Sequence, residues 1–234
     1  MAETLLSIRN VSNEYLNHRP GLIGMERRKP VLKNINLELK HGEVLGLTGK
    51  SGCGKTTLAR CILGLIDYQG EILLNGQPVR QRTGQIQMIF QEPGASLNPT
   101  KKIGWLLEEP LVINKFRSNN SVPKTKKERG KIIDEMLIRT GLNPSYKSRS
   151  VHELSGGQKQ RICIARALIL NPRLLIADEA ISSLDVSSGA QILNLFNELH
   201  ENLKLDILFI SHNKNAVEYF CDRIVEMWDG KVVE

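Results

Sequence analysis

Residues 49–56 have the types and the spacing needed to hold a chain of phosphates. They read Gly-Lys-Ser-Gly-Cys-Gly-Lys-Thr, which fits GxxxxGK[ST] at every fixed position. An apolar run, Val44–Leu47, precedes them, and a helical pattern begins at Lys55. Glycine lets successive backbone N–H groups turn toward phosphate oxygens, and the helix N-terminus adds partial positive charge. We therefore predict a phosphate-binding loop formed by Gly49, Ser51, Gly52, Cys53, Gly54, Lys55, Thr56 and Thr57.

Two side chains of this loop have separate predicted roles. Lys55 should neutralise the β- and γ-phosphates of a nucleoside triphosphate. The Thr56 hydroxyl should bind Mg²⁺.

Two carboxylates end a second apolar run and could bind metal and activate water. Leu174–Ala177 reads as a buried strand, and Asp178 and Glu179 follow it. Asp178 is predicted to hold Mg²⁺, while Glu179, on the other side of the pleat, would orient and activate the attacking water. Alone, two acids here could equally begin a loop or cap a helix. The phosphate loop upstream favours the catalytic interpretation.

A third segment, residues 154–161, reads Leu-Ser-Gly-Gly-Gln-Lys-Gln-Arg and precedes a helical pattern. The Ser155 hydroxyl and the amides of Gly156 and Gly157 could form an anion site at a helix N-terminus. Since the chain has only one phosphate loop, we infer a head-to-tail dimer in which the loop of one chain and this segment of another hold each nucleotide. The segment resembles the LSGGQ signature of ABC ATPases. The resemblance covers essentially the whole chain and implies the same dimer, with ATP and Mg²⁺ as cofactors.

The resemblance implies roles for further residues. Gln91 matches the Q-loop glutamine, which places it among the catalytic and metal-binding residues. Gln158 of the signature and Asp185 of the D-loop are implied nucleotide contacts. His212 matches the switch histidine that would contact the γ-phosphate, and it ends a strand, where open α/β sheets bind ligands. Tyr15 lies where the family has an aromatic residue that stacks on adenine.

One stretch narrows the resemblance to the ATP-binding subunits of peptide/nickel importers. Phe90–Pro99 reads FQEPGASLNP, similar to the FQDPxxSLNP pattern of that group, and Glu108–Leu111 follows at the expected distance. Ser51–Lys55, and Ala180 where peptide importers usually have proline, lean toward nickel or a metal chelate as the cargo. The resemblance therefore implies a subunit that powers uptake of nickel, a metal chelate or peptides.

The same resemblance implies the partners and the location. Transmembrane permease subunits, a second ATPase subunit and an extracytoplasmic substrate-binding protein are expected, and nucleic acid is not. In this group two different ATPase subunits usually pair, which favours a heterodimer. The expected location is peripheral, at the cytoplasmic face of the cell membrane.

The surface around Ala95–Trp105 is expected to receive a short helix of a membrane subunit. Leu97 and Trp105 are the candidate apolar contacts on it. The alternative is that Trp105 belongs to the core of the helical insertion.

The elements that must position these residues alternate between strands and helices, which is typical of an α/β domain. Short apolar runs predict strands at Leu5–Val11, Val31–Leu39, Glu43–Leu47, Glu71–Leu74, Ile86–Phe90, Leu174–Ala177, Ile207–Ile210 and Arg223–Met227. Helical patterns lie at Lys55–Leu65, Glu128–Thr140, Gly157–Leu170, Ser187–Leu203 and Lys214–Cys221. The expected fold is α/β, a P-loop NTPase of the ABC ATPase type. It should have a mainly parallel sheet, an N-terminal antiparallel β layer and a helical subdomain at about 95–155, within a single domain of residues 1–234.

Composition agrees with a folded domain that has no export signal. The chain has 234 residues, of which 41% are hydrophobic and 24% charged, and a net charge of +7. No apolar run of 18 residues and no secretory signal occur. The four cysteines are scattered without a CxxC pair, which argues against structural zinc and indicates buried or incidental thiols.

Much of the positive charge lies between residues 101 and 131, a stretch that contains nine Lys and Arg and three Glu. A solvated surface loop is the simpler interpretation of this stretch, and attraction to an anionic membrane or nucleic acid is the alternative. No aromatic residues interleave the charges as single-strand binding would favour.

Two other classes of function are the alternatives. An ABC ATPase of a soluble assembly remains the alternative, although the sequence lacks the long coiled coil of repair members and the second ATPase domain of translation members. A P-loop kinase would have no use for the LSGGQ segment.

Overall fold

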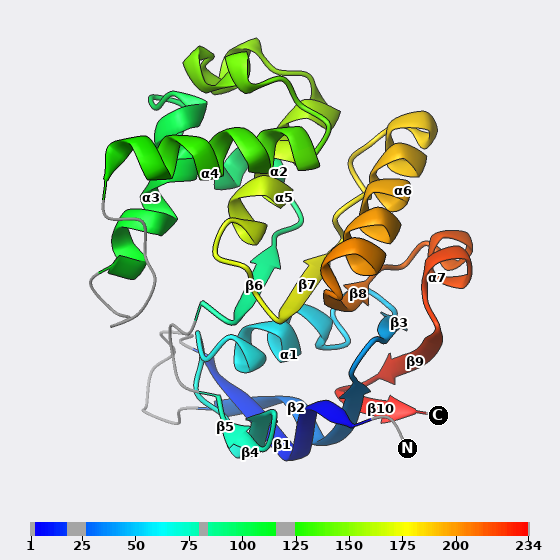
Figure 1. Cartoon of the computed structure of the whole chain (residues 1–234). Coiled ribbons are helices and arrows are strands. Elements are labelled where there is room, and N and C mark those ends of the chain that lie inside the picture. Colours follow the sequence, from blue (N-terminus) through cyan, green and yellow to red (C-terminus); the bar gives the residue numbers. More distant parts are fainter. Residues whose placement is uncertain (1–2, 18–26, 80–83, 116–124, 234) are drawn as a thin grey trace, which may run out of the picture. The chain divides into compact units, whose positions relative to one another are not determined.

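The structure is a computed structural model that describes residues 3–17, 27–79, 84–115 and 125–233. It forms two compact units. The first comprises Met1–Thr83 with Asp206–Glu234, and the second comprises Gly84–Leu205 (Figure 1).

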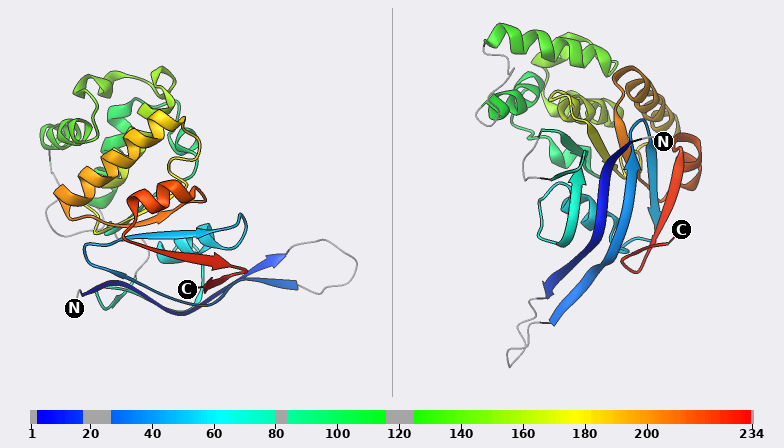
Figure 2. Two further views of the ribbon diagram at one scale, coloured as in Figure 1. Left: turned by 90° about the vertical axis from the view of Figure 1, so that its right-hand side faces the viewer. Right: turned by 60° about the horizontal axis from the view of Figure 1, so that its bottom comes forward.

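The first unit contains the predicted antiparallel β layer. Its strands are β1 (Thr4–Asn17), β2 (Arg27–Lys40), β4 (Gln69–Leu74) and β5 (Gln77–Pro78), in the order β2-β1-β4-β5. Along β2, the buried side chains of Leu32, Ile35, Leu37 and Leu39 are separated by exposed polar ones, as in a sheet with one covered face. β1 and β2 run on beyond their last pairing with β4 as a two-stranded ribbon (Figure 2).

A second group of strands in the same unit carries the phosphate loop. β3 (Val44–Gly49) pairs in parallel with β8 (Asp206–Ile210) and β9 (Arg223–Trp228), and β10 (Lys231–Val233) pairs antiparallel with β9. β8 is buried throughout, as expected for a strand covered on both faces. Two helices contact β3, namely α1 (Lys55–Ile62) and α7 (Lys214–Phe220).

A glycine explains how closely α7 approaches β3. A Cβ at Gly46 would lie 2.7 Å from Val217 Cγ1 and 2.9 Å from Cys221 Sγ, so a side chain at this position would push the helix away. The Phe209 ring of β8 packs edge-on against Phe220 of α7, with centroids 5.1 Å apart.

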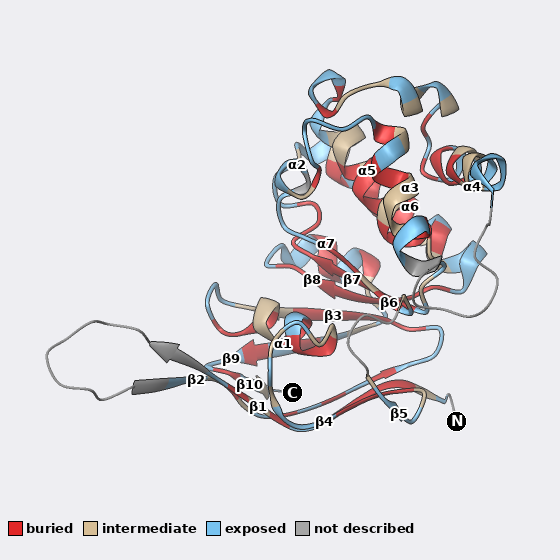
Figure 3. Ribbon diagram, turned by 90° about the vertical axis from the view of Figure 1, so that its left-hand side faces the viewer, coloured by how far each residue is buried: buried red, intermediate tan, exposed pale blue. Residues whose placement is uncertain are grey.

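The second unit joins a parallel strand pair to helices. β6 (Ile86–Ile89) pairs in parallel with β7 (Leu174–Asp178). α5 (Gly156–Leu168) contacts β6 and α6 (Val186–Leu203), and its buried residues are visible in Figure 3. Between β6 and α5 lie α2 (Pro93–Ser96), α3 (Ile103–Lys115), α4 (Lys126–Arg139) and the 3-10 turns η1 (Pro144–Ser148) and η2 (Val151–Glu153).

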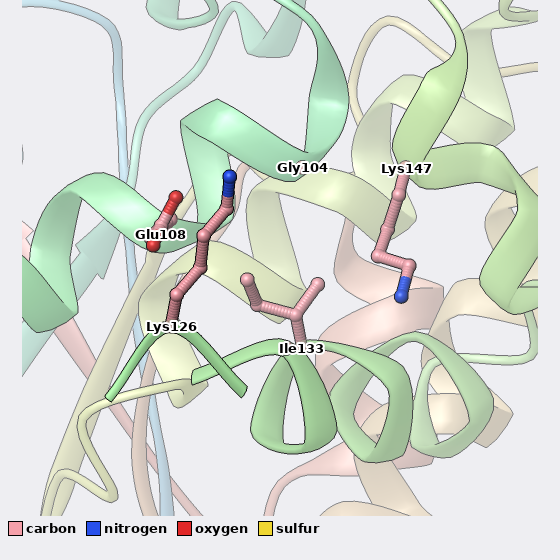
Figure 4. A pocket seen from close by; sticks show the side chains of 6 residues that line it. Gly104, Glu108, Lys126, Ile133 and Lys147 are labelled. Carbon is pink, nitrogen blue, oxygen red and sulfur yellow. The ribbon is translucent and has the colours of Figure 1, made fainter. Parts of the chain in front are cut away.

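Ion pairs tie α3 to its neighbours. Arg129 of α4 donates to Glu108 at 2.8 Å, and Arg166 of α5 donates to Glu109 at the same distance. A cavity of about 260 Å³ between α3, α4 and η1 has Ile133 between Lys126 and Lys147 (Figure 4). Its lining residues are Gly104, Glu108, Lys126, Gly130, Ile133 and Lys147.

The prediction that Leu97 is a surface contact is wrong. Its side chain is 1% exposed, because α2 packs against α5 and turns Leu97 inward. Trp105 is 42% exposed and the Lys101 ammonium lies 4.9 Å from its ring centroid, so the alternative that Trp105 is a core residue is also wrong. On the same face of α3, seven residues further on, Val112 is also exposed.

All four cysteines, which lie within the described residues, are thiols outside any disulfide, and Cys53, Cys61 and Cys163 are buried, in agreement with the prediction of buried or incidental cysteines. In the part of the chain that the structure describes, every helix is too short or too polar to traverse a bilayer. The interpretation of the basic stretch 101–131 as a loop is wrong for residues 103–115 and 126–131, which lie in α3 and α4, while residues 116–124 lie outside the described residues.

Candidate functional site

The phosphate loop leaves β3 at Gly49 and enters α1 at Lys55. Its glycines are required by the backbone path. Gly49 has φ 137°, and a Cβ there would lie 2.3 Å from the Met227 carbonyl oxygen. Gly54 is the N-cap of α1 with φ 113°, in the left-handed region. Gly52, with φ 80°, has open space where a Cβ would be.

The loop surrounds one buried cation. Lys55 is 8% exposed, and its ammonium donates to the carbonyl oxygens of Gly49 at 2.7 Å and Lys50 at 3.1 Å. The Cys53 thiol is 3.9 Å from the same ammonium. The first turn of α1 contains no acidic residue that would repel an anion. A buried ammonium held by two backbone carbonyls fits a phosphate group, which would complete its charge compensation.

The remaining predicted loop residues differ in exposure. Ser51 and Gly52 are exposed, while Thr56 and Thr57 are half-buried at the start of α1. The structure thus places all eight predicted residues in one loop and the following helical turn.

His212 comes to the same strand edge as this loop. β3 and β8 are parallel, with Leu47 paired to Ile210, and the Ser211 N–H donates to the Leu47 carbonyl at 3.3 Å. Gly49 and His212 each follow this pair by two residues, so both lie at the carboxyl ends of adjacent strands. His212 is exposed, as contact with a ligand requires.

In the second unit, Gln91 and Glu179 likewise lie at the carboxyl ends of two adjacent parallel strands. β6 and β7 are parallel, with Ile89 paired to Ala177. Gln91 and Glu179 each follow that pair by two residues, and Asp178 ends β7. Three predicted catalytic or metal-binding residues are therefore brought to one edge of the strand pair.

Glu179 has an unusual backbone. It is 8% exposed and has φ 52°, a left-handed conformation that is uncommon for a residue other than glycine. The Ser182 N–H and hydroxyl both donate to the Glu179 carbonyl, at 3.1 and 2.8 Å. Such strain is concentrated at functional sites, where surrounding contacts hold it in place.

The donor types suit Mg²⁺ held jointly with a phosphate ligand. Asp178, only 2% exposed, and Gln91 offer oxygen atoms. Among the described residues, no group of three His, Cys, Asp or Glu is arranged to hold a metal by itself. Mg²⁺ commonly takes one or two protein oxygens together with substrate phosphates, which fits this limited set.

The segment at 154–161 is an N-capped helix start. The Ser155 hydroxyl accepts from the Gln158 N–H at 3.3 Å, and the Gln158 side chain accepts from the Ser155 N–H at 3.0 Å. The Gln158 side-chain amide also donates to the Tyr146 hydroxyl at 3.0 Å. Ser155 and Gly156 are exposed and Gly157 is half-buried, so the helix start is open to a ligand.

Asp185 caps the next helix in a similar way. Its carboxylate accepts from the Ser188 N–H at 2.9 Å and from the Ser188 hydroxyl at 2.7 Å. These bonds, the backbone one above all, lower the pKa of the Asp185 carboxyl. Asp185 thus has a local structural role, and any contact with nucleotide would be additional.

The predicted adenine contact, Tyr15, lies only partly within the described residues. The backbone of Tyr15 lies in β1, but its side chain is outside the described residues. Sequence reasoning missed Ser182, Tyr146 and the contact between Lys50 and Trp228, because the motif patterns leave those positions unspecified.

Comparison with known proteins gives consistent results. A sequence model of the family described as "ABC transporter" matches residues 32–182. The oligopeptide transport ATP-binding protein AppF of Bacillus subtilis is 43% identical, over 99% of this chain and 71% of that protein. The dipeptide transport ATP-binding protein DppF of Escherichia coli is 41% identical, over 92% of this chain and 65% of that protein. The dimeric post-hydrolysis structure of the ATP-binding cassette MJ0796, bound to ADP and Pi, has a TM-score of 0.81 at 28% identity and covers 98% of this chain and 97% of its own.

Proposed function

The chain belongs to the ABC transporter family, and from this membership we propose that it is the ATP-hydrolysing subunit of a peptide importer. The observation that carries the proposal is the 43% sequence identity to AppF over 99% of the chain. The buried Lys55 within its glycine loop supports ATP binding, the first step of that function.

The roles proposed for the residues in hydrolysis are those that the motifs and the family resemblance imply. Lys55 and the loop amides bind the phosphates, and Thr56, Gln91 and Asp178 would hold Mg²⁺. The metal, when bound, neutralises phosphate charge. Glu179 accepts a proton from water while the water oxygen bonds to the γ-phosphorus and the bond to the β–γ bridging oxygen breaks. His212 donates to the γ-phosphate, and Tyr15 stacks on adenine.

A second ATPase chain completes the nucleotide site in this proposal. Ser155, Gly156, Gly157, Gln158 and Asp185 of one chain contact the nucleotide bound by the loop of the other. The open start of α5 supports this role, and the cassette MJ0796 was determined as a dimer. Two different ATPase subunits remain our expectation for the pair.

The importer requires membrane partners. Permease subunits would carry the peptide, an extracytoplasmic protein would deliver it, and this chain would act at the cytoplasmic face of the membrane. A helical subdomain at about 95–155 within one ATPase domain would receive the permease. The exposed side chains of Trp105 and Val112 on α3 support contact there, in place of Leu97.

Peptide is preferred to nickel as the cargo because AppF and DppF are named for oligopeptide and dipeptide transport. The lean toward nickel or a metal chelate from Ser51–Lys55 and Ala180 remains a prediction. A soluble assembly remains the alternative function.

Reconstitution tests the proposal directly. The chain, its membrane subunits and its second ATPase subunit are placed in proteoliposomes, and uptake of labelled peptide and of nickel is measured with and without ATP. We expect ATP-dependent peptide uptake. Failure of the chain to co-purify with membrane subunits would favour the soluble assembly, and uptake of nickel alone would overturn the choice of cargo.

A further inference from the structure

The hairpin of β9 and β10 supports the phosphate loop through its backbone. The Gly230 N–H donates to the Cys53 carbonyl oxygen at 3.1 Å. Gly49 pairs with Met227 of β9 so closely that a Cβ at Gly49 would be 2.3 Å from the Met227 carbonyl oxygen. The loop is therefore bounded on this side by the hairpin.

The hairpin is itself fixed to β2. The Lys33 N–H donates to the Gly230 carbonyl at 2.7 Å, and the Lys33 ammonium pairs with Asp229 at 2.6 Å. Asp229 and Gly230 have φ 44° and 76°, the conformations of a tight two-residue hairpin turn. A Cβ on Gly230 would lie 2.3 Å from the Val31 carbonyl oxygen. The turn thus holds the residue before it, Trp228, in a defined position.

Trp228 makes the remaining contact with the loop. Its side chain is 52% exposed, and the Lys50 ammonium lies 4.6 Å from its ring centroid. An ammonium within about 6 Å of an indole centroid is attracted by the ring. Lys50 is the second residue of the loop and is also exposed, so its side chain would be free to move without this contact.

The backbone of Lys50 is central to the loop. Its carbonyl oxygen accepts from the Lys55 ammonium at 3.1 Å and from the Cys53 N–H at 3.2 Å. Rotation of the Lys50 peptide would remove both bonds and leave the Gly49 carbonyl as the remaining oxygen partner of the ammonium that the phosphates require. A contact that restrains the Lys50 side chain therefore also restrains the carbonyl that positions Lys55.

We propose that Trp228 is a positioning residue for ATP binding, which holds the Lys50 side chain outward and so keeps the phosphate loop in the conformation that presents Lys55. The inference rests on the proposed function, since it requires ATP to bind this loop. A loop fixed before binding loses less conformational freedom when ATP arrives, which raises affinity. Trp228 itself need not touch the nucleotide.

A double-mutant cycle tests this inference. The affinity of the chain for Mg-ATP is measured by calorimetry with Trp228→Leu, Lys50→Met, the double variant and Trp228→Tyr. We expect Trp228→Leu to weaken binding about 2- to 5-fold, as for an exposed cation–π pair, and to have no further effect when Lys50 is already Met. Trp228→Tyr keeps a ring and should restore most of the affinity. Ile224→Ala, exposed on the same strand, is the matched control and should leave affinity unchanged in both backgrounds.

A spectroscopic measurement separates positioning from stability. The chain has two tryptophans, so Trp105→Phe leaves Trp228 as the sole indole. In that background Lys50→Met should shift Trp228 emission, and thermal unfolding should show that Trp228→Leu stays folded. The positioning role would be overturned if Trp228→Leu weakened Mg-ATP binding equally in the presence of Lys50 and of Lys50→Met. It would also be overturned if Trp228→Leu left the affinity unchanged and lowered only the melting temperature. Absence of binding by the unaltered chain would instead contradict the proposed function, and this inference with it.

Discussion

The ammonium of Lys55 lies 2.7 Å from the carbonyl oxygen of Gly49, inside the loop that joins β3 to α1. Two backbone carbonyl oxygens, those of Gly49 and Lys50, hold this buried ammonium within the loop that is proposed to bind the phosphates. When phosphates bind, the ammonium gains strong anionic partners in addition to these carbonyls. Affinity for ATP should therefore depend strongly on this one side chain.

We expect Lys55→Ala to weaken binding of Mg-ATP by roughly 10- to 100-fold and to remove turnover, since hydrogen bonds to charged groups contribute about 1.5–3 kcal/mol. Calorimetry on the isolated chain measures the change. Arg60→Ala is the matched control, because Arg60 is an exposed cation in the last turn of the same helix. Full affinity in the Lys55 variant would rule out the phosphate-loop assignment.

Glu179→Gln should lower the rate of ATP hydrolysis by about 10²–10⁴-fold and leave ATP binding intact, because the amide cannot accept the proton of water. The substitution keeps the size of the side chain and the hydrogen bonds from Ser182 to the backbone. Turnover and affinity are measured together, with the second ATPase subunit present if activity requires it. Lost affinity with retained turnover would contradict the role of Glu179.

Protein stability should fall in alkali because desolvation disfavours ionisation of two buried thiols, Cys61 and Cys163, and of the half-buried Cys221. Burial raises the pKa of Cys61 and Cys221 to about 12 and that of Cys163 to about 11, from 9.0. The folded chain disfavours the thiolate, so the stabilisation is complete below pH 9 and is lost as the pH rises through 11–12. At pH 10 the loss should be on the order of 1 kcal/mol for each thiol.

Urea unfolding at pH 8 and pH 10 measures this loss. Cys61→Ala should reduce the difference between the two pH values, while other alkaline titrations remain the same in both proteins. The same pH dependence in the variant would show that Cys61 is not responsible.

The sequence predicts the strand ends well because its buried strands are short apolar runs followed directly by polar residues. Parallel pairing then brings Gln91 and Glu179 to one edge, and Gly49 and His212 to another. The left-handed backbone of Glu179 could not be predicted, since its side chain gives no sign of positive φ. β10 is missed because its three residues are too few to show a period.

Leu97 and Trp105, the two apolar side chains expected to contact the permease, show why side-chain exposure is harder to predict than strand ends. The family resemblance implies a permease contact around Ala95–Trp105 and so a surface position for Leu97, but tertiary packing buries it. Trp105 lies in a helix rich in apolar residues, and only the packing of α3 against α4 and α5 decides which of them face outward.

The exposed face of α3 leads to a prediction about coupling. Trp105 and Val112 are seven residues apart on this helix, so they lie on one face, with Glu108 and Glu109 between them. We call these two exposed apolar side chains the stripe, and an aromatic residue at such a surface is a common binding hot spot. Trp105→Ala with Val112→Ser should impair both complex formation with the membrane subunits and peptide uptake. ATP binding by the isolated chain should not change, because Lys55 and its loop are untouched.

Two further variants make this experiment decisive. Ile138→Ser is the matched control, since Ile138 is exposed on α4 outside the stripe, and uptake should remain at the level of the unaltered protein. Leu97→Asp should instead lower the stability of the helical region itself, because it places a charge in a buried site. Thermal unfolding distinguishes a loss of stability, expected for Leu97→Asp, from a loss of permease contact, expected for Trp105→Ala with Val112→Ser. If the doubly substituted α3 variant assembles with the membrane subunits and transports peptide normally, the stripe does not contact the permease, and its exposed apolar side chains require another partner.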